Sequence, residues 1–375
     1  MLDQLNDRSD EVPAVTVDWM PWSHVMGGSA EFHRVLGEGG TLYIDDGKPT
    51  LEGFARTLRN LREIAPTRYA SVPAGYAMLA DALEAEPGLA AKFFSRLRTL
   101  AYGGARLPDE LFERFQALAV RSAGHRVPFL SGYGATETAP SATFVFWPSE
   151  RAGLIGLPQP GVTLKLEPLE GDRYEIRIRG DSVMPGYLNH PEATVAAFDS
   201  EGYYKTGDAA AFVDPEDPRE GLIFAGRIAE EFKLASGVFV RVGALRVDVL
   251  EHAAPLLLDL VVTGPDRPFV AGMAWLNPAA CRKLAGGEAP GHDELVQSPE
   301  VRAAIRAAIE VRNAKVTGGS LRIARLLLLT EPPSMDAGEI TDKGYVNQRR
   351  VLERRAPDVE RLYGNPVADD VLIFQ

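Results

Sequence analysis

The chain has 375 residues, of which 45% are hydrophobic and 25% charged, and its formal net charge is −12. This length can bury a large core and predicts a globular protein of two or three domains. Acidic and basic residues are mixed along the chain, whereas a phosphate-binding surface normally needs clustered Lys and Arg, so the composition argues against nucleic acid as a partner.

Cysteine content and apolar runs exclude two further classes. Cys281 is the only cysteine, so no disulfide framework exists, and we expect a small buried hydrophobe in a reducing compartment. The longest apolar runs, such as residues 326–330, have the length of strands and fall far short of the ~18 residues of a membrane span. The acidic N-terminus lacks the order of a secretory signal. We therefore expect a cytoplasmic protein that does not enter a membrane.

The first part of the chain alternates strand-like and helix-like segments. Predicted strands lie at 15–20, 41–46 and 126–130, and predicted helices at 51–66 and 108–123. The first helix repeats apolar residues on one face until Pro66 stops it, and the second begins with Pro108 and acidic residues that suit the positive end of a helix dipole. This alternation predicts an α/β domain with a partly parallel sheet.

From about residue 153 the pattern changes to short strands and turns. Predicted strands at 161–169 and 174–180 are followed by a turn-rich surface loop at 214–221. From about residue 228 the pattern is α+β, with predicted strands at 259–264, 269–276 and 322–330 and predicted helices at 244–256 and 299–314. We expect a β-rich lobe followed by a small α+β domain.

Two stretches that suggest other chemistry fail on inspection. Residues 45–50 contain Gly47-Lys48, but Leu42 stands where a phosphate-binding loop needs a glycine, so a turn after a strand is the better interpretation. The six histidines do not form a zinc-ligand spacing, and the nucleophile elbow of serine hydrolases is absent.

The segment FLSGYGATETAP at 129–140 carries more chemistry. A strand leads into a tight turn in which Gly132 and Gly134 would let the backbone approach a ligand closely. Thr136 offers a hydroxyl to a phosphate, Glu137 offers a hard carboxylate oxygen to Mg²⁺, and Tyr133 would lie against a base or pack in the core. Taken alone, a capped helix start or a plain loop explains this segment better.

Three later segments change that balance. In residues 203–214, Gly207-Asp208 ends a short segment, and a carboxylate there can hold both hydroxyls of a ribose. In residues 224–237, Arg227 follows a glycine and precedes a charged linker. Lys343 lies between two glycines near the C-terminus, where a lone lysine is usually only solvated.

Together these segments resemble the acyl-adenylate-forming (AMP-binding) superfamily of acyl- and aryl-CoA ligases, luciferases and peptide-synthetase adenylation domains. The segments that carry the resemblance, in the family's order, are PWSHVMGG (21–28), AYGGARLP (101–108), YGATET (133–138), YKTGD (204–208), GRIAEEFKLASG (226–237) and ITDKGY (340–345). Long stretches are most similar to feruloyl-CoA synthase and relatives that activate hydroxycinnamates. The resemblance covers nearly the whole chain.

The resemblance implies an α/β fold with a large domain at 1–226, whose β-rich lobe is about 153–226, and a mobile α+β lid domain at 227–375 with its hinge at about 227–233. It implies an ATP-dependent acid–CoA ligase that adenylates a hydroxycinnamate such as ferulate and then forms the CoA thioester. ATP, Mg²⁺ and CoA would be required. Two alternatives remain: an acid of another aryl or fatty class, and a carrier protein in place of CoA.

Residue roles follow by similarity. Lys343 would bridge the phosphate and the attacking carboxylate, Thr136 would contact the α-phosphate, and Glu137 would hold Mg²⁺. His24 would lie at the acyl carboxylate, although a satisfied histidine beside Trp22 is the competing interpretation. The residues expected to bind the nucleotide or CoA are Gly103, Gly104, Ala105, Tyr133, Gly134, Asp208, Arg227 and Gly237.

One family element is not found in residues 1–20. The Ser/Thr/Gly-rich loop whose lysine grips the β- and γ-phosphates would precede PWSHVMGG, and nothing there resembles it. We therefore expect the incomplete large domain of a longer architecture. A non-catalytic or partner-dependent remnant that binds AMP or acyl-CoA is the alternative from another class, and a homo-oligomer is left open.

Overall fold

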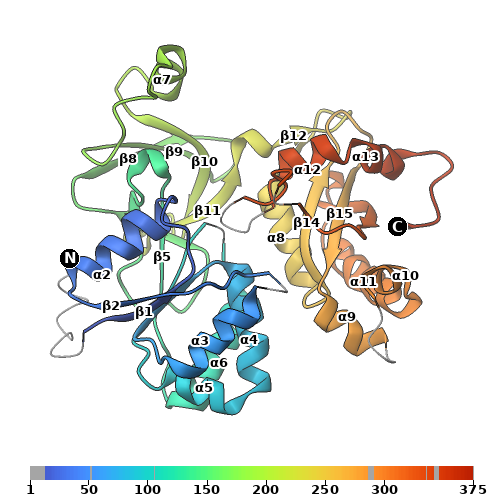
Figure 1. Ribbon diagram of the computed structural model, residues 1–375. Coiled ribbons are helices and arrows are strands. Elements are labelled where there is room, and N and C mark those ends of the chain that lie inside the picture. Colours follow the sequence, from blue (N-terminus) through green and yellow to red (C-terminus); the bar gives the residue numbers. More distant parts are fainter. Residues whose placement is uncertain are drawn as a thin grey trace. The chain divides into compact units, whose positions relative to one another are not determined.

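The computed structural model describes residues 13–50, 53–104, 106–285, 291–334, 336–341 and 346–374. The chain divides into two compact units that separate between Ala225 and Gly226. Each unit is built on its own main sheet, and the two are described in turn (Figure 1).

The first unit contains an 11-stranded sheet among its described residues, in the order β2-β1-β3-β4-β5-β6-β7-β11-β10-β9-β8. Its strands are β1 Val15–Asp18, β2 Thr41–Ile44, β3 Arg68–Ser71, β4 Thr99–Tyr102, β5 Phe129–Tyr133, β6 Thr143–Phe144, β7 Leu154–Pro158, β8 Val162–Pro168, β9 Tyr174–Gly180, β10 Tyr204–Phe212 and β11 Leu222–Arg227. Its helices are α2 His33–Gly37, α3 Phe54–Glu63, α4 Pro73–Ala85, α5 Pro87–Phe94, α6 Asp109–Ala123 and α7 Pro191–Ala197, and a π-helical turn spans Met26–Phe32.

Strands β2, β1, β3, β4 and β5 pair in parallel, which confirms the predicted partly parallel sheet. Helices α3–α6 gather on one face of this half (Figure 1) and form a continuous apolar core with the strands. Alternation along β3 places Tyr69 in that core and Ala70 in a smaller apolar cluster on the opposite face.

The predicted β-rich lobe does not form a sheet of its own. Its strands β7–β11 continue the same 11-stranded sheet, with antiparallel pairing of β5 to β6, β6 to β7, β8 to β9 and β9 to β10. The alternation predicted for 174–180 is confirmed as β9, whose Ile176 and Ile178 are fully buried.

Two local predictions differ from the structure. The helix expected at 244–256 is α8 Val242–His252, because Pro255 disfavours helical backbone at the preceding residue and the helix ends before it. Gly207-Asp208 does not end a segment, because β10 continues through both residues to Phe212. By contrast, the helix predicted at 299–314 is observed with these bounds.

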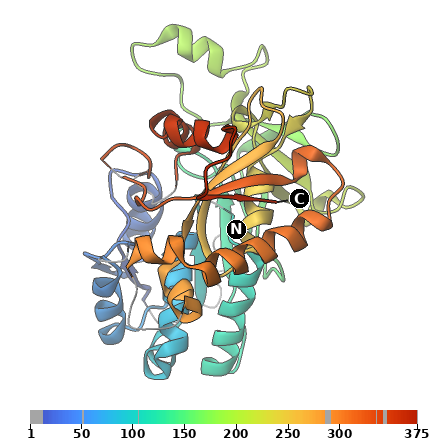
Figure 2. The same ribbon diagram turned by 90° about the vertical axis from the view of Figure 1, so that its right-hand side faces the viewer.

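The second unit has a four-stranded sheet in the order β14-β15-β16-β17. Its strands are β12 Phe232–Lys233, β13 Phe239–Val240, β14 Leu257–Thr263, β15 Val270–Leu276, β16 Ile323–Leu328 and β17 Val371–Ile373, and its helices are α8 Val242–His252, α9 Pro278–Ala285, α10 His292–Gln297, α11 Pro299–Ala314, α12 Gln348–Arg354 and α13 Ala356–Tyr363. Helices α8–α11 and helices α12 and α13 cover opposite faces of this sheet (Figure 2). Every residue of β15 is buried, and Cys281 is buried as predicted.

Candidate active site

The turn after β5 leaves two of its three polar side chains at least partly accessible to solvent. Thr136–Thr138 form one turn of 3₁₀-helix. Thr138 is fully buried, and its hydroxyl oxygen accepts the Ala135 amide at 2.8 Å, so this residue stabilises the turn. Thr136 is exposed and Glu137 half-buried, and both are therefore available to a ligand.

Close packing explains why glycine stands at positions 132 and 134. A Cβ atom on Gly132 would lie 2.8 Å from Cδ2 of Phe144, and one on Gly134 would run into the carbonyl oxygen of Pro140. Both glycines thus let the turn fold closely against β6 and the segment before it. Close approach of a ligand to Gly134, which the sequence predicted, remains a prediction.

Strand β10 brings Asp208 to this turn. The β9–β10 register shifts between Lys205 and Ala209, and Gly207 has a φ of +69° that few side chains tolerate. The hydroxyl of Tyr133 donates a hydrogen bond to Oδ2 of Asp208 at 2.8 Å. Residues 75 positions apart in the chain are thus joined by this hydrogen bond.

The Tyr133 side chain is packed against an apolar cluster of the first unit. Its ring packs against Phe224 with the ring centroids 6.3 Å apart, and burial, with Asp208 beside it, raises the pKa of its phenol well above the ordinary range. The hydroxyl therefore stays protonated and serves as a hydrogen-bond donor to the carboxylate. Adenine stacking on Tyr133 remains a prediction.

Sequence reasoning missed Tyr187. Its hydroxyl donates to Oε1 of Glu137 at 2.9 Å, and the Met184 amide donates to the Glu137 carbonyl at 2.8 Å. Nothing in the local sequence singles out this tyrosine, because the contact spans 50 positions of the chain.

The carboxyl ends of the parallel strands hold the remaining predicted residues of the first unit. Gly103 and Gly104 follow β4, and a Cβ atom on Gly103 would lie 3.0 Å from Cε of Met26. Ligands of open α/β sheets commonly bind along this edge. Ala105 lies outside the described residues.

His24 lies in the segment that follows β1, next to Met26. Its Nδ1 accepts the Met26 amide at 3.1 Å, so in the neutral ring the proton is on Nε2. The ring is half-buried. The hydrogen bond fixes the imidazole orientation at the edge of the sheet where a substrate carboxylate is expected.

Asp18, at the end of β1, is a second residue that the sequence analysis missed. Its side chain is 3% exposed, and Oδ1 accepts the Met20 amide at 3.0 Å, while Oδ2 has no hydrogen-bond partner among the described residues. Burial first, and then Glu31 and Asp45, raise the pKa of this carboxyl to about 7. Its carboxyl group is therefore only partly ionised near neutral pH.

Arg227 and Gly237 lie past the boundary at Gly226 and belong to the second unit. Arg227 ends β11, and Gly237, with a φ of +81°, lies in the tight turn that connects β12 and β13. No side chain in the described residues lies within 4 Å of a Cβ built on Gly237. Lys343 lies outside the described residues. The structure thus joins Thr136, Glu137, Tyr133 and Asp208 within one unit and describes Arg227 and Gly237 separately.

The donor set fits a magnesium ion that arrives with a nucleotide. In the part of the chain that the structure describes, no group of three His, Cys, Asp or Glu side chains forms a metal site. Magnesium commonly takes only one or two carboxylates and completes its octahedron with water and phosphate oxygens. Glu137 is such a single carboxylate, half-buried beside the exposed Thr136.

The model of the family described as AMP-binding enzyme matches residues 3–188, which include the turn after β5. This part of the chain belongs to the AMP-binding enzyme superfamily. The chain has the adenylation-domain fold, in which a large mixed sheet with helices is followed by a smaller C-terminal sheet subdomain.

Individual AMP-binding relatives extend the comparison. The chain is 29% identical over 273 residues to the long-chain-fatty-acid–CoA ligase FadD15 of Mycobacterium bovis, covering 71% of this chain and 42% of the relative. It is 26% identical over 382 residues to a carboxylic acid reductase of Segniliparus rugosus, covering 95% of this chain and 30% of the relative. The solved A domain of that reductase, in complex with AMP and a co-purified carboxylic acid, superposes with a TM-score of 0.72 at 25% identity and covers 96% of this chain and 56% of that one.

The chain therefore spans less than half the length of these two curated AMP-binding relatives. None of the helices that the structure describes is both long and apolar enough to cross a membrane.

Proposed function

We propose that this AMP-binding chain activates a carboxylic acid with ATP as an acyl-adenylate and passes the acyl group to a thiol. The observation that carries the proposal is the junction of Thr136 and Glu137 with Asp208 through Tyr133. The two relatives and the A domain compared above support the reaction class: one is named a long-chain-fatty-acid–CoA ligase, one a carboxylic acid reductase, and the A domain binds AMP and a carboxylic acid.

In the first half-reaction, a carboxylate oxygen attacks the α-phosphorus of ATP, and the bond to the pyrophosphate breaks. Negative charge collects at the phosphorus, so donors and cations must already be in place. The Thr136 hydroxyl would donate to the α-phosphate, and Lys343 would neutralise the phosphate and the attacking carboxylate. Magnesium, when bound, would supply further positive charge at the phosphates, with Glu137 as its protein ligand.

Asp208 would hold the ribose, since one carboxylate can accept both hydroxyl groups. Tyr133 occupies Oδ2 of Asp208 at 2.8 Å and thereby fixes the orientation of the carboxylate. Gly103 and Gly104 would border the adenine, and His24 would meet the acyl carboxylate. Arg227 would assist at the ribose, and Gly237 would border the pantetheine path, with residues 227–233 as the hinge between the two states.

In the second half-reaction, a thiol sulfur attacks the acyl carbonyl, the bond to the phosphate oxygen breaks and AMP leaves. We propose CoA as the acceptor and a hydroxycinnamate such as ferulate as the acid. An apolar cluster near His24 supports an acid with an aromatic or apolar body: Met20 and Leu130 are buried, with Trp19, Met26 and Phe144 packed against them.

The similarity to a carboxylic acid reductase over 95% of the chain favours one second candidate, in which the acceptor is the thiol of a carrier protein. Both candidates share the adenylation step and differ only in the acceptor. A partner-dependent chain would need a second polypeptide for either.

The test measures AMP release from ATP and Mg²⁺ by the purified chain with ferulate, coumarate, caffeate, benzoate or octanoate, each with CoA or with a phosphopantetheinylated carrier. CoA-dependent AMP formation with a hydroxycinnamate, lost in Lys343→Ala, is the expected result. Preference for octanoate would replace the proposed acid, and activity only with the carrier would replace the proposed acceptor. A folded chain that forms no AMP with any combination would refute the proposal.

A further inference from the structure

Glu137, the proposed magnesium ligand, is held from a neighbouring segment of the first unit. The hydroxyl of Tyr187 donates to Oε1 of Glu137 at 2.9 Å, and the Met184 amide donates to the Glu137 carbonyl at 2.8 Å. Side chain and backbone of the same residue are therefore bound by the segment that follows β9. A glutamate has three rotatable side-chain bonds, so the hydroxyl restricts which way the carboxylate points.

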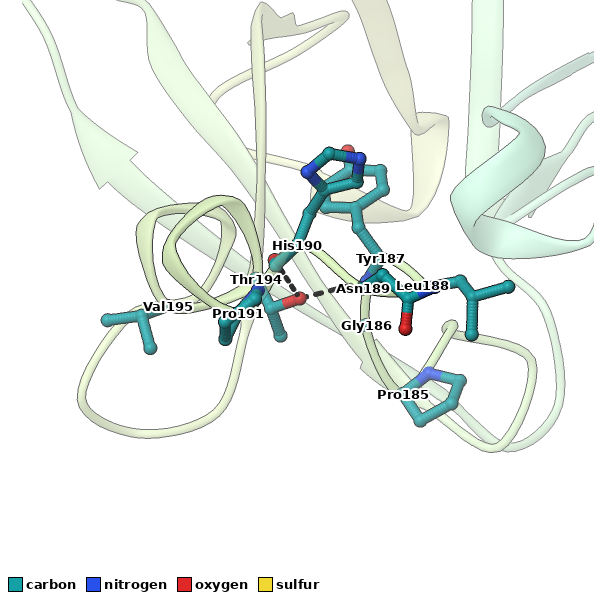
Figure 3. A pocket seen from close by; sticks show the side chains of 9 residues that line it. All are labelled: Pro185, Gly186, Tyr187, Leu188, Asn189, His190, Pro191, Thr194 and Val195. Carbon is teal, nitrogen blue, oxygen red and sulfur yellow. Dashed lines mark hydrogen bonds between the residues drawn. The ribbon is translucent and has the colours of Figure 1, made fainter.

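Tyr187 is itself anchored at its backbone (Figure 3). Its amide donates to Oγ1 of Thr194 at 2.9 Å, and the Thr194 hydroxyl and amide each donate to the His190 carbonyl at 3.0 Å. Gly186 has a φ of +153°, and a Cβ atom there would lie 2.6 Å from Cγ2 of Thr194. The loop and the start of α7 thus form a compact unit that fixes Tyr187 beside an open hollow of about 640 Å³.

Tyr204 is a second phenol close to Tyr187 and Glu137. It is 7% exposed. Burial first, and then the charge of Glu137, raise the pKa of the Tyr204 phenol. Two phenols thus lie close to the Glu137 carboxylate, and the hydroxyl of Tyr187 donates a hydrogen bond to it.

We propose that Tyr187 is a positioning residue, whose hydroxyl holds the Glu137 carboxylate in the orientation that receives the magnesium ion of ATP. The inference rests on the proposed function. The geometry assigns the role to Tyr187 because its hydroxyl is the hydrogen-bond donor at Oε1 of Glu137, and Thr194 fixes the backbone from which it reaches. Groups behind a metal ligand typically tune metal affinity by orienting that ligand.

The test compares Tyr187→Phe with the wild-type chain. Phenylalanine keeps the ring and removes only the donor. Binding of a fluorescent ATP analogue is titrated with Mg²⁺ at fixed analogue concentration. The half-saturating Mg²⁺ concentration is expected to rise about tenfold, while binding in excess EDTA stays unchanged. Tyr43→Phe, on the exposed edge strand β2, is the matched control and is expected to match the wild type.

Two further variants keep the proposal falsifiable. Thr194→Val removes the acceptor of the Tyr187 amide and is expected to shift the Mg²⁺ dependence in the same direction, which provides a test if Tyr187→Phe fails to fold. In a Glu137→Gln background, adding Tyr187→Phe is expected to change nothing more, because Tyr187 acts through Glu137.

Three results would overturn the positioning role: wild-type Mg²⁺ dependence in Tyr187→Phe, an equal shift in Tyr43→Phe, or an undiminished shift on top of Glu137→Gln. Each of these leaves the proposed function intact, since the wild-type chain still binds the nucleotide. If the folded wild-type chain does not bind the ATP analogue with Mg²⁺ at all, the proposed function fails and the positioning role fails with it.

Discussion

Carboxylates in two regions of the molecule are held in opposite ways. In the second unit, Glu339 is fully buried and binds the guanidinium groups of Arg354 and Arg355 at 2.7–3.0 Å. In the first unit, Glu137 and Asp208 are only half-buried, and their carboxylates accept the hydroxyls of Tyr187 and Tyr133. An arginine forms an ion pair that neutralises the carboxylate and stabilises the fold. A neutral phenol only donates a hydrogen bond, so it orients the carboxylate and does not neutralise its charge.

The strands that carry these regions differ in the same way. Strand β15 is buried at every position and is one of the two inner strands of the four-stranded sheet. Strand β10 shifts its register at Gly207 and presents Asp208. A fully buried inner strand stabilises the fold, whereas a register shift in a partly exposed strand can re-aim a side chain such as Asp208. This difference predicts that substitutions in the two regions separate stability from nucleotide binding.

The largest effect on stability is expected for Glu339→Gln. Loss of the carboxylate leaves the charge of Arg355, a residue only 5% exposed, without its main partner, and we expect a loss of about 3–5 kcal/mol in the free energy of unfolding. Urea denaturation measures this. Glu353→Gln, whose carboxylate pairs with Arg349 and Arg350 at the surface, is the control and should leave the stability close to that of the wild type. Equal losses in both variants would remove the distinction between the two kinds of carboxylate.

Glu137→Gln should show the reverse behaviour. The amide keeps the shape and the acceptor for Tyr187 but removes the charge that a magnesium ion needs. We expect acid-dependent AMP formation to fall about 100-fold, with little change in thermal stability. Steady-state kinetics at saturating ATP and a thermal melt check both parts. A variant that melts much earlier than the wild type would assign Glu137 to structure.

Acid sensitivity of the first unit is expected to depend on Glu31. Burial alone would raise the pKa of this carboxyl, but Arg68 and Arg34 outweigh it and lower the pKa to about 2. A lowered folded-state pKa gives stability that is present above the ordinary value of 4.5 and lost as the pH falls towards 2. Between about pH 5 and pH 2, we expect the free energy of unfolding to decrease by about 2 kcal/mol less in Glu31→Gln than in the wild type. Urea titrations at successive pH values measure this. An unchanged slope would contradict the ion-pair account.

Asp18 is expected to act with the opposite sign. Its pKa is raised to about 7 in the folded chain, so its contribution to stability is full below its ordinary value of 3.8 and is lost as the pH rises to 7. Asp18→Asn removes the ionisation and keeps the acceptor for the Met20 amide. We compare the free energy of unfolding of the variant with that of the wild type at pH 5 and at pH 8. The difference is expected to shift by about 1–2 kcal/mol in favour of the variant at pH 8. Melting curves at the two pH values decide this, and a loss of equal size at both would refute it.

The smallest effect is expected for Gly207→Ala, which has a matched control. Gly207 and Gly202 have φ values of +69° and +79°, and a Cβ atom on either would meet nothing within 4 Å. Alanine at either site should cost about 1 kcal/mol of backbone strain. Only Gly207→Ala should also weaken binding of an ATP analogue, because Asp208 follows it. Equal binding by both variants would show that the shift in β10 has no role in presenting Asp208.

The elements predicted best from the sequence are those that local rules decide. Alternation of Ile176 and Ile178 predicted β9, and Pro108 with the acids after it predicted α6 almost to the residue. Helices α4 and α5 were not predicted, because Pro73 and Pro87 stand at the first helical position, where proline begins a helix, rather than marking a loop.

The residues of the candidate site divide along the same line. Thr136, Glu137 and Asp208 were found because short segments carry them. Tyr187 and Asp18 were missed because their significance arises from the fold: Tyr187 reaches Glu137 across 50 positions, and sheet packing buries Asp18. Local patterns show which side chains can do chemistry, and only tertiary contacts show which groups orient them.

Adenylation by the purified chain is tested by acid-dependent exchange of labelled pyrophosphate into ATP. Exchange reports the adenylation step alone, so the identity of the thiol acceptor does not affect it. The account predicts exchange with a hydroxycinnamate and Mg²⁺ that is lost in Glu137→Gln and kept in Glu353→Gln. A folded chain that binds ATP but shows no exchange with any acid of the panel, or equal exchange in both variants, would contradict it.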